Sequence, residues 1–169
     1  MENEKDSHKI LILEDDQDQM DFLVNIAQQE IQKRLHNLES NDNQVDKIVI
    51  VKLTNLQSLK KAVSSYDKVI LALMDCNIPD RRGGKSNDQL VKTNYKITGQ
   101  HNAVDTVLEK MSDVPITLIS AKNRFKKIIR QYYESNLDIT INFIKKEDHD
   151  VIAKNIRYYL NMYLNRLNQ

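Results

Sequence analysis

Five short apolar runs, separated by helical patterns, constrain the fold of this chain more than any other feature. Each run is rich in Ile, Val or Leu and lacks clean alternation over most of its length. This pattern is typical of parallel strands that are covered on both faces. The runs are Ile10–Leu13, Ile48–Val51, Val69–Met74, Ile116–Ile119 and Ile139–Ile144.

Amphipathic helical patterns follow the runs, because apolar residues recur at steps of three and four and so share one helix face. The apolar positions are Met20, Val24, Ala27, Ile31, Leu35 and Leu38, then Leu59 and Val63, then Val104, Val107, Leu108 and Met111, then Phe125, Ile128, Ile129 and Tyr132, and finally Ile152, Ile156, Tyr159 and Tyr163. Polar residues predict the helix starts. These are Thr54 with Gln57, Asn102 with Asp105, and Asp148 or Asp150.

The order of elements is therefore strand and helix, repeated five times. Short crossovers of this kind force parallel strands and right-handed connections, which gives an α/β fold with a doubly wound five-stranded parallel sheet. The flavodoxin-like strand order 2-1-3-4-5 is the natural candidate, and ligands bind such sheets outside the carboxyl ends of the strands. We expect a single domain over residues 1–169, with a core over about 8–167.

One segment, from about residue 80 to 101, departs from this repeat. It is polar, has no clear period and contains all three glycines of the chain. It is also longer than the 2–6 residues of a typical connection between a strand and a helix. We therefore predict an insertion after the third strand, with room for a short strand or helix around Leu90–Ile97.

Charge and composition exclude several classes of function. The 25 Lys and Arg residues nearly balance 24 Asp and Glu residues, for a net charge of +1. No global field draws the chain to nucleic acid or to an anionic membrane. The one cysteine, Cys76, excludes an intrachain disulfide, and the longest apolar run is far shorter than the ~20 residues that cross a bilayer. We expect a cytoplasmic protein without membrane insertion.

Acidic and polar residues follow the predicted strands. Glu14, Asp15 and Asp16 come after the first run, and Asp75 directly follows the third. In the predicted topology these two strands are neighbours, so their carboxylates face each other at one edge. Two carboxylates ~4 Å apart repel by roughly 4 kcal/mol at an effective dielectric of ~20, which favours a bound cation such as Mg²⁺. The alternative is that Glu14, Asp15 and Asp16 are simply solvated and cap the helix that follows them.

Four motifs in order resemble those of response-regulator receiver domains of bacterial two-component systems. The segment ILILEDDQDQM resembles their first strand with its acidic pair, and LMDCNIPD resembles their phosphoacceptor strand. PITLISA resembles their fourth strand, and NFIKK resembles the aromatic-x-x-Lys of the fifth. Together the motifs span residues 10–146, and each alone is a weak signal.

This resemblance implies a role for each matching residue. Asp75 would be the phosphoacceptor. Asp15 and Asp75 would bind Mg²⁺, Glu14 would bind it directly or through water, and the backbone carbonyl of Asn77 would complete the protein ligands. The cofactor that we expect is therefore Mg²⁺.

The resemblance also assigns residues from the last two strands. Ser120 would donate its hydroxyl to the phosphoryl group, and Lys146 would pair with the carboxylate or the phosphate. Ser120 and Phe143 would form the switch, although Phe143 lacks the hydroxyl of the commoner tyrosine. Glu147 stands where many receivers have proline. A shift of one residue would replace Lys146 by Lys145, but the spacing from the aromatic residue favours Lys146.

The function implied is that of a response regulator made of a receiver domain alone. It would take phosphate from a sensor histidine kinase or a histidine phosphotransfer protein and signal by contact with a downstream protein. A homodimer through the fourth and fifth helices would also be consistent. The phosphotransfer and dephosphorylation would be self-catalysed, so we do not expect a turnover enzyme.

Three alternatives stay open at this point. The first is a pseudo-receiver, which uses the same fold as a phosphate-independent binding module. The second is a Mg²⁺-dependent phosphatase with an aspartyl-phosphate intermediate, although that class typically has an aspartate where Asn77 stands. The third is a flavin-binding protein of similar topology.

Overall fold

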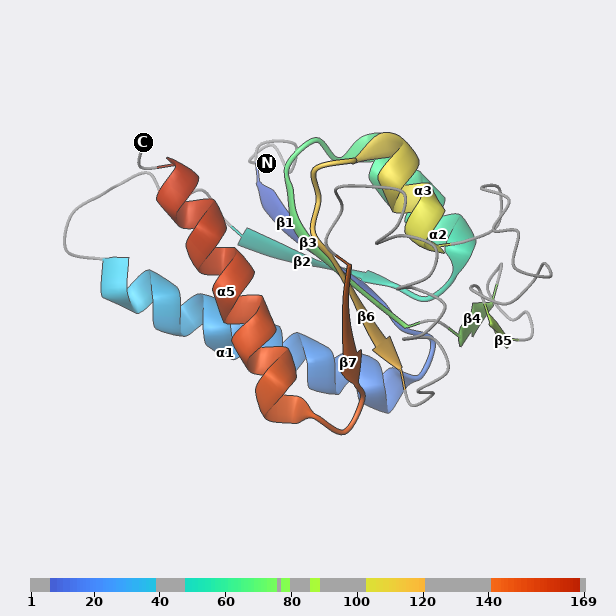
Figure 1. Cartoon of the computed structure of the whole chain (residues 1–169), viewed down its shortest axis with the longest axis horizontal. Helices are drawn as coiled ribbons and strands as arrows, with labels where there is room; N and C mark the ends of the chain where they lie inside the picture. The colour runs from blue at the N-terminus through green and yellow to red at the C-terminus, as the bar shows by residue number, and fades with distance from the viewer. Residues whose placement is uncertain are drawn as a thin grey trace, which may run out of the picture.

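Five parallel strands form the central sheet of the structure, a computed structural model that describes residues 7–38, 48–75, 77–79, 86–88, 103–120 and 141–167. The strands are β1 (His8–Leu13), β2 (Ile48–Leu53), β3 (Val69–Asp75), β6 (Ile116–Ser120) and β7 (Ile141–Lys145). Their order in the sheet is β2-β1-β3-β6-β7 (Figure 1). In terms of the five predicted runs this is 2-1-3-4-5, so the predicted fold class is confirmed.

The strands are mostly apolar because both faces of the sheet are covered. All six residues of β1 are buried. Leu11 and Leu13 belong to one core cluster and Ile10 and Ile12 to the other, as the two-residue period of a strand requires. Each such side chain contributes about 1.5–3 kcal/mol when it is removed from water. The sheet therefore has a hydrophobic core on each of its two faces.

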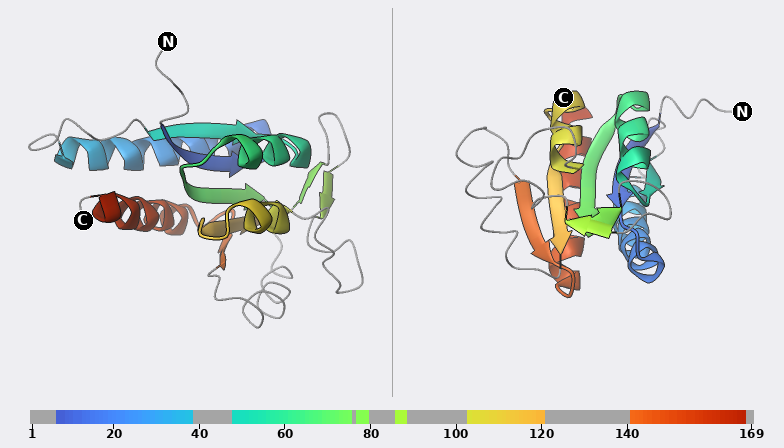
Figure 2. Two further views of the ribbon diagram at one scale, coloured as in Figure 1. Left: turned by 90° about the horizontal axis from the view of Figure 1, so that it is seen from above. Right: turned by 90° about the vertical axis from the view of Figure 1, so that its right-hand side faces the viewer.

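Helices cover the sheet in two pairs. Figures 1 and 2 show α2 (Leu56–Ser65) and α3 (Ala103–Lys110) side by side on one face. On the other face α1 (Gln17–Leu38) packs against α5 (His149–Leu167). Among the described residues no helix is both long and apolar enough to span a membrane.

The structure corrects the predicted N-cap of α2. The cap of α2 is Asn55 with Ser58, and not Thr54 with Gln57. The Asn55 side chain accepts a hydrogen bond from the Ser58 backbone N–H at 2.8 Å, and the Ser58 hydroxyl accepts one from the Asn55 N–H at 3.3 Å. A serine hydroxyl can return this bond as a glutamine would, so the sequence offered two overlapping capping boxes.

Acidic residues directly precede two other helices, α1 and α5. Asp16 caps α1, because its carboxylate accepts a hydrogen bond from the Gln19 backbone N–H at 3.0 Å. At α5 it is Asp148, rather than Asp150, that precedes the first helical residue, His149. Helix capping, the alternative role that the sequence allowed for the three acidic residues, therefore applies to Asp16.

A small antiparallel sheet follows β3 and was not predicted. It pairs β4 (Asn77–Pro79) with β5 (Ser86–Asp88), so β5 falls inside the predicted insertion. The predicted element at Leu90–Ile97 and the predicted fourth helix, with Phe125 and Tyr132, lie outside the residues that the structure describes.

Candidate metal centre

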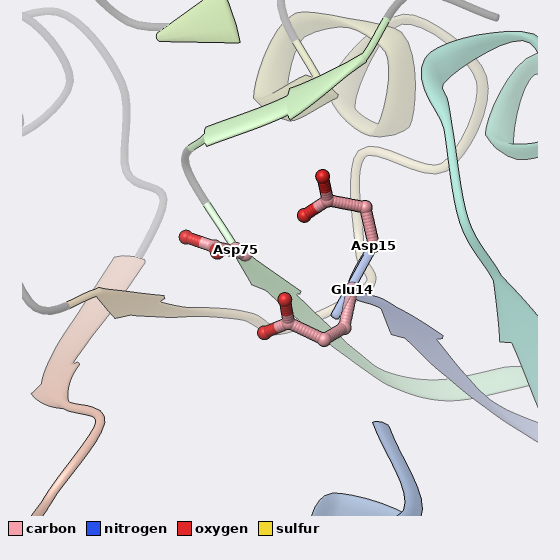
Figure 3. A group of neighbouring side chains, drawn as sticks. All are labelled: Glu14, Asp15 and Asp75. Carbon is pink, nitrogen blue, oxygen red and sulfur yellow. The ribbon is translucent and has the colours of Figure 1, made fainter. Parts of the chain in front are cut away.

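The carboxyl edge of the sheet brings three acids together from two neighbouring strands. Glu14 and Asp15 follow β1, and Asp75 is the last residue of β3. Each offers a carboxylate oxygen, and these oxygens all lie within 4.8 Å of one another. Figure 3 shows the three side chains gathered around one space. The predicted convergence of residues 14, 15 and 75 is therefore present in the structure.

The three acids differ sharply in exposure. Glu14 is 1% exposed and Asp75 is 6% exposed, whereas Asp15 is exposed. Glu14 extends the pairing of β1 with β2, because its backbone N–H donates to the Leu53 carbonyl at 2.9 Å. Its carboxylate also accepts a hydrogen bond from the Asp16 N–H at 3.2 Å. Glu14 is thus held by the backbone, while Asp15 faces solvent.

Among the described residues, Lys146 forms ion pairs with two of these acids. Its ammonium group lies 2.8 Å from Glu14 Oε2 and 2.7 Å from Asp75 Oδ2. The neighbouring Lys145 is exposed, so the choice of Lys146 over Lys145 agrees with the geometry. Three carboxylates and one ammonium leave a formal charge of −2 when all are ionised, and one divalent cation would neutralise it.

Burial and neighbouring charges shift the pKa values of Glu14 and Lys146. Burial raises the pKa of the Glu14 carboxyl, and the charge of Asp75 raises it further, although Lys146 opposes both. Burial by itself would lower the pKa of the Lys146 ammonium, but its hydrogen bonds to Asp75 and Glu14 outweigh this and raise that pKa. The lysine is therefore a fixed positive charge at neutral pH.

The donor set suits a hard cation. Carboxylate oxygens with access to solvent on one side are the ligands that Mg²⁺ prefers, since it usually keeps several waters. Glu14, Asp15 and Asp75 supply such oxygens, and Asp15 is exposed to solvent. The residues present therefore fit Mg²⁺.

Of the remaining predicted site residues, Ser120 and Asn77 lie near the same edge and Phe143 lies within the sheet. Ser120 ends β6 and is 2% exposed, one residue beyond Ile119, which pairs with Asp75. Asn77 is the first residue of β4, two positions after Asp75. Phe143 lies in the middle of β7, opposite Leu118, and packs against the core on the side of α2 and α3. Ser120 and Asn77 are thus close to Asp75 along the chain or the sheet, and Phe143 belongs to the core beside them.

Comparison with known proteins identifies the fold. No protein-family model and no curated protein matches the sequence. Solved structures do match. The receiver domain of NtrX from Brucella abortus superposes with a TM-score of 0.56 at 14% identity, over 90% of this chain and 98% of that one. The chain has the fold of response-regulator receiver domains.

Two more receiver structures support this. The N-terminal domain of a response regulator/sensory box/GGDEF protein from Carboxydothermus hydrogenoformans has a TM-score of 0.55 at 19% identity, over 94% of this chain and 98% of that one. The signal receiver domain of an HD domain-containing protein from Pseudomonas fluorescens Pf-5 has a TM-score of 0.52 at 10% identity, over 100% and 98%. At these identities the likeness concerns the fold, and the chemistry must be argued from this chain's own residues.

Sequence reasoning missed two features of the site. It paired Lys146 with Asp75 or a phosphate, but it did not predict the second ion pair, to Glu14. It also did not predict the β4–β5 pairing beside Asn77. No periodic signal could have revealed the ion pair, since side-chain contacts across a sheet edge depend on strand register.

Proposed function

We propose that this chain is a receiver domain that accepts a phosphoryl group on Asp75 with the help of Mg²⁺. The observation that carries this proposal is the position of the Asp75 carboxylate, at the end of the central strand β3, among two further carboxylates and within 2.7 Å of the Lys146 ammonium. A carboxylate nucleophile beside a cation and a candidate metal site suits phosphoryl transfer, which depends mainly on positioning and charge stabilisation.

The transfer that we propose uses a phosphohistidine as donor. An Asp75 oxygen forms a bond to phosphorus as the P–N bond breaks, and the imidazole nitrogen keeps the electron pair and takes up a proton. Lys146 stays close enough to pair with the phosphorylated side chain, and Ser120, at the end of the next strand, would supply a hydroxyl donor. A bound Mg²⁺ would offset the negative charge on the phosphoryl oxygens.

This chemistry defines the proposed partners. The donor would be a sensor histidine kinase or a histidine phosphotransfer protein, and the output would be contact with a downstream protein. We propose self-catalysed transfer and hydrolysis rather than turnover of a free substrate. A homodimer through the fourth and fifth helices stays a prediction, because the fourth helix lies outside the described residues.

The test is intact-mass measurement after incubation with acetyl phosphate and Mg²⁺. We expect the wild-type chain to gain the mass of one phosphoryl group, and to lose that gain when EDTA replaces Mg²⁺. Asp75→Ala should gain none, whereas Asp113→Ala, which changes an exposed aspartate in the loop before β6, should behave as wild type.

Two results would overturn the proposal. No mass gain on the wild type, alongside a receiver that is phosphorylated under the same conditions, would favour the pseudo-receiver. Steady hydrolysis of a phosphate ester that disappears in Asp75→Asn would favour the phosphatase.

A further inference from the structure

The small β4–β5 sheet begins two residues after Asp75, at the edge of the candidate metal centre. Figures 1 and 2 place it beyond the carboxyl ends of the central strands, apart from the five-stranded sheet. In Figure 3 the short strand that follows β3 rises directly from the end that carries Asp75. The path of the chain through Asn77 is therefore set by this pairing.

The register of β4 and β5 determines which backbone N–H and C=O groups form hydrogen bonds between the two strands. Asn77 pairs with Asp88, Ile78 with Asn87 and Pro79 with Ser86. In an antiparallel pair, opposed residues alternate between those that exchange two backbone hydrogen bonds and those that exchange none. Pro79 has no N–H to donate, so its pair cannot be of the exchanging kind.

The alternation then assigns the exchanged bonds to Ile78 and Asn87. Asn77, one residue earlier, falls on a pair that exchanges none, so its carbonyl points away from β5. The core also holds Ile78, because its side chain is 0% exposed and belongs to the hydrophobic cluster that α2 and α3 cover. Ile78 is thus held by the core and by β5, and it adjoins a carbonyl that the β4–β5 pairing does not use.

We propose that the β4–β5 pair positions the Asn77 backbone carbonyl as a ligand of the metal at Glu14, Asp15 and Asp75. This inference rests on the proposed function of that site. Asn87 is then a positioning residue: its backbone N–H and carbonyl hold Ile78, and Ile78 sets the direction of the preceding carbonyl. The insertion would in this way contribute to metal affinity without supplying a side-chain ligand.

The test compares two prolines in the same strand. Asn87→Pro removes an N–H that the pairing uses, whereas Ser86→Pro removes one that it does not use. Loss of an outer-shell support typically lowers metal affinity by about 10–100-fold. We expect Asn87→Pro to weaken Mg²⁺ binding, measured by titration calorimetry with MgCl₂, by about tenfold or more. Ser86→Pro, the matched control, should bind Mg²⁺ as the wild type does.

Stability must be separated from affinity. Far-UV circular dichroism and urea unfolding of each variant report whether the domain is folded. If Asn87→Pro does not fold, Ile78→Val provides the second variant, and it should weaken Mg²⁺ binding because it loosens the anchor of β4.

The outcomes distinguish this inference from the proposed function. A wild type that binds no Mg²⁺ would overturn the metal centre itself. A wild type that binds Mg²⁺, with a folded Asn87→Pro or Ile78→Val of equal affinity, would overturn only the positioning role. Equal losses in Asn87→Pro and Ser86→Pro would likewise contradict it, since the hydrogen-bond pattern would then not matter.

Discussion

Substituting methionine for Lys146 is the most direct test of the electrostatics at this edge of the sheet. The change removes the ammonium group that lies 2.8 Å from Glu14 and 2.7 Å from Asp75. Glu14 is 1% exposed, so in metal-free buffer its carboxylate would be buried without its cation. Breaking such a pair costs about 3–5 kcal/mol when both partners are buried, and Lys146 is 20% exposed, which favours the lower part of this range.

Protonation of Glu14 sets an upper limit on the destabilisation that Lys146→Met causes. The folded variant can bind a proton at Glu14, and holding that carboxyl neutral at pH 7 costs about 1.36 × (7 − 4.3), or about 3.7 kcal/mol, relative to the unfolded chain. At pH 5 the same limit falls to about 1 kcal/mol. Because the folded pKa of Glu14 is raised, the penalty is absent below the unfolded pKa and grows as the pH rises toward the folded pKa.

Urea unfolding in EDTA at pH 7 and pH 5 measures both values. We expect Lys146→Met to lose about 3 kcal/mol at pH 7 and about 1 kcal/mol or less at pH 5. Lys145→Met, which removes an exposed lysine next to it, should lose little at either pH. Added Mg²⁺ should stabilise Lys146→Met more than the wild type, since a divalent cation supplies the missing charge. An equal loss at the two pH values, or an equal loss in Lys145→Met, would refute the reasoning.

Two further predictions concern the scaffold that positions the site. Glu30 on α1 is 3% exposed and receives hydrogen bonds from Arg157 on α5 at 2.7 and 3.0 Å, which lower the pKa of its carboxyl. Because that pKa is lowered, its contribution is present at neutral pH and is lost as the pH falls through the folded pKa. Glu30→Gln should therefore cost about 1 kcal/mol at pH 7 and less near pH 3, by urea unfolding, and a constant difference would contradict this account. Asn55→Ala should lower stability by about 1 kcal/mol through loss of the α2 cap, while Thr54→Ala should cost less; the reverse order in thermal unfolding would restore the predicted Thr54 cap.

The sequence alone determined the five strands of the central sheet, their order and the edge at which the acidic residues lie. Apolar runs such as Val69–Met74 indicate strand burial directly, because a strand covered on both faces is apolar at nearly every position. Once the strands are parallel, their carboxyl ends share one edge. Acids that follow the first and third strands must then meet, and Glu14 and Asp75 do.

Local signals were less decisive where two readings satisfy the same chemistry. Thr54 with Gln57 and Asn55 with Ser58 are both polar pairs three residues apart, and only the structure shows which pair caps α2. The β4–β5 pairing has strands of three residues each, too short for a period to be recognised.

Only the tertiary structure decided how the charges are distributed. Glu14 and Asp15 are adjacent and chemically alike, yet one is buried against Lys146 and the other is exposed. The pair Glu14–Lys146 spans 146 − 14 = 132 positions and two strands that are not neighbours in the sheet. Such contacts depend on the direction in which each side chain leaves its strand end and on the register of the intervening strands. Periodicity within a segment carries no information about either, so the residue types were predictable and their pairing was not.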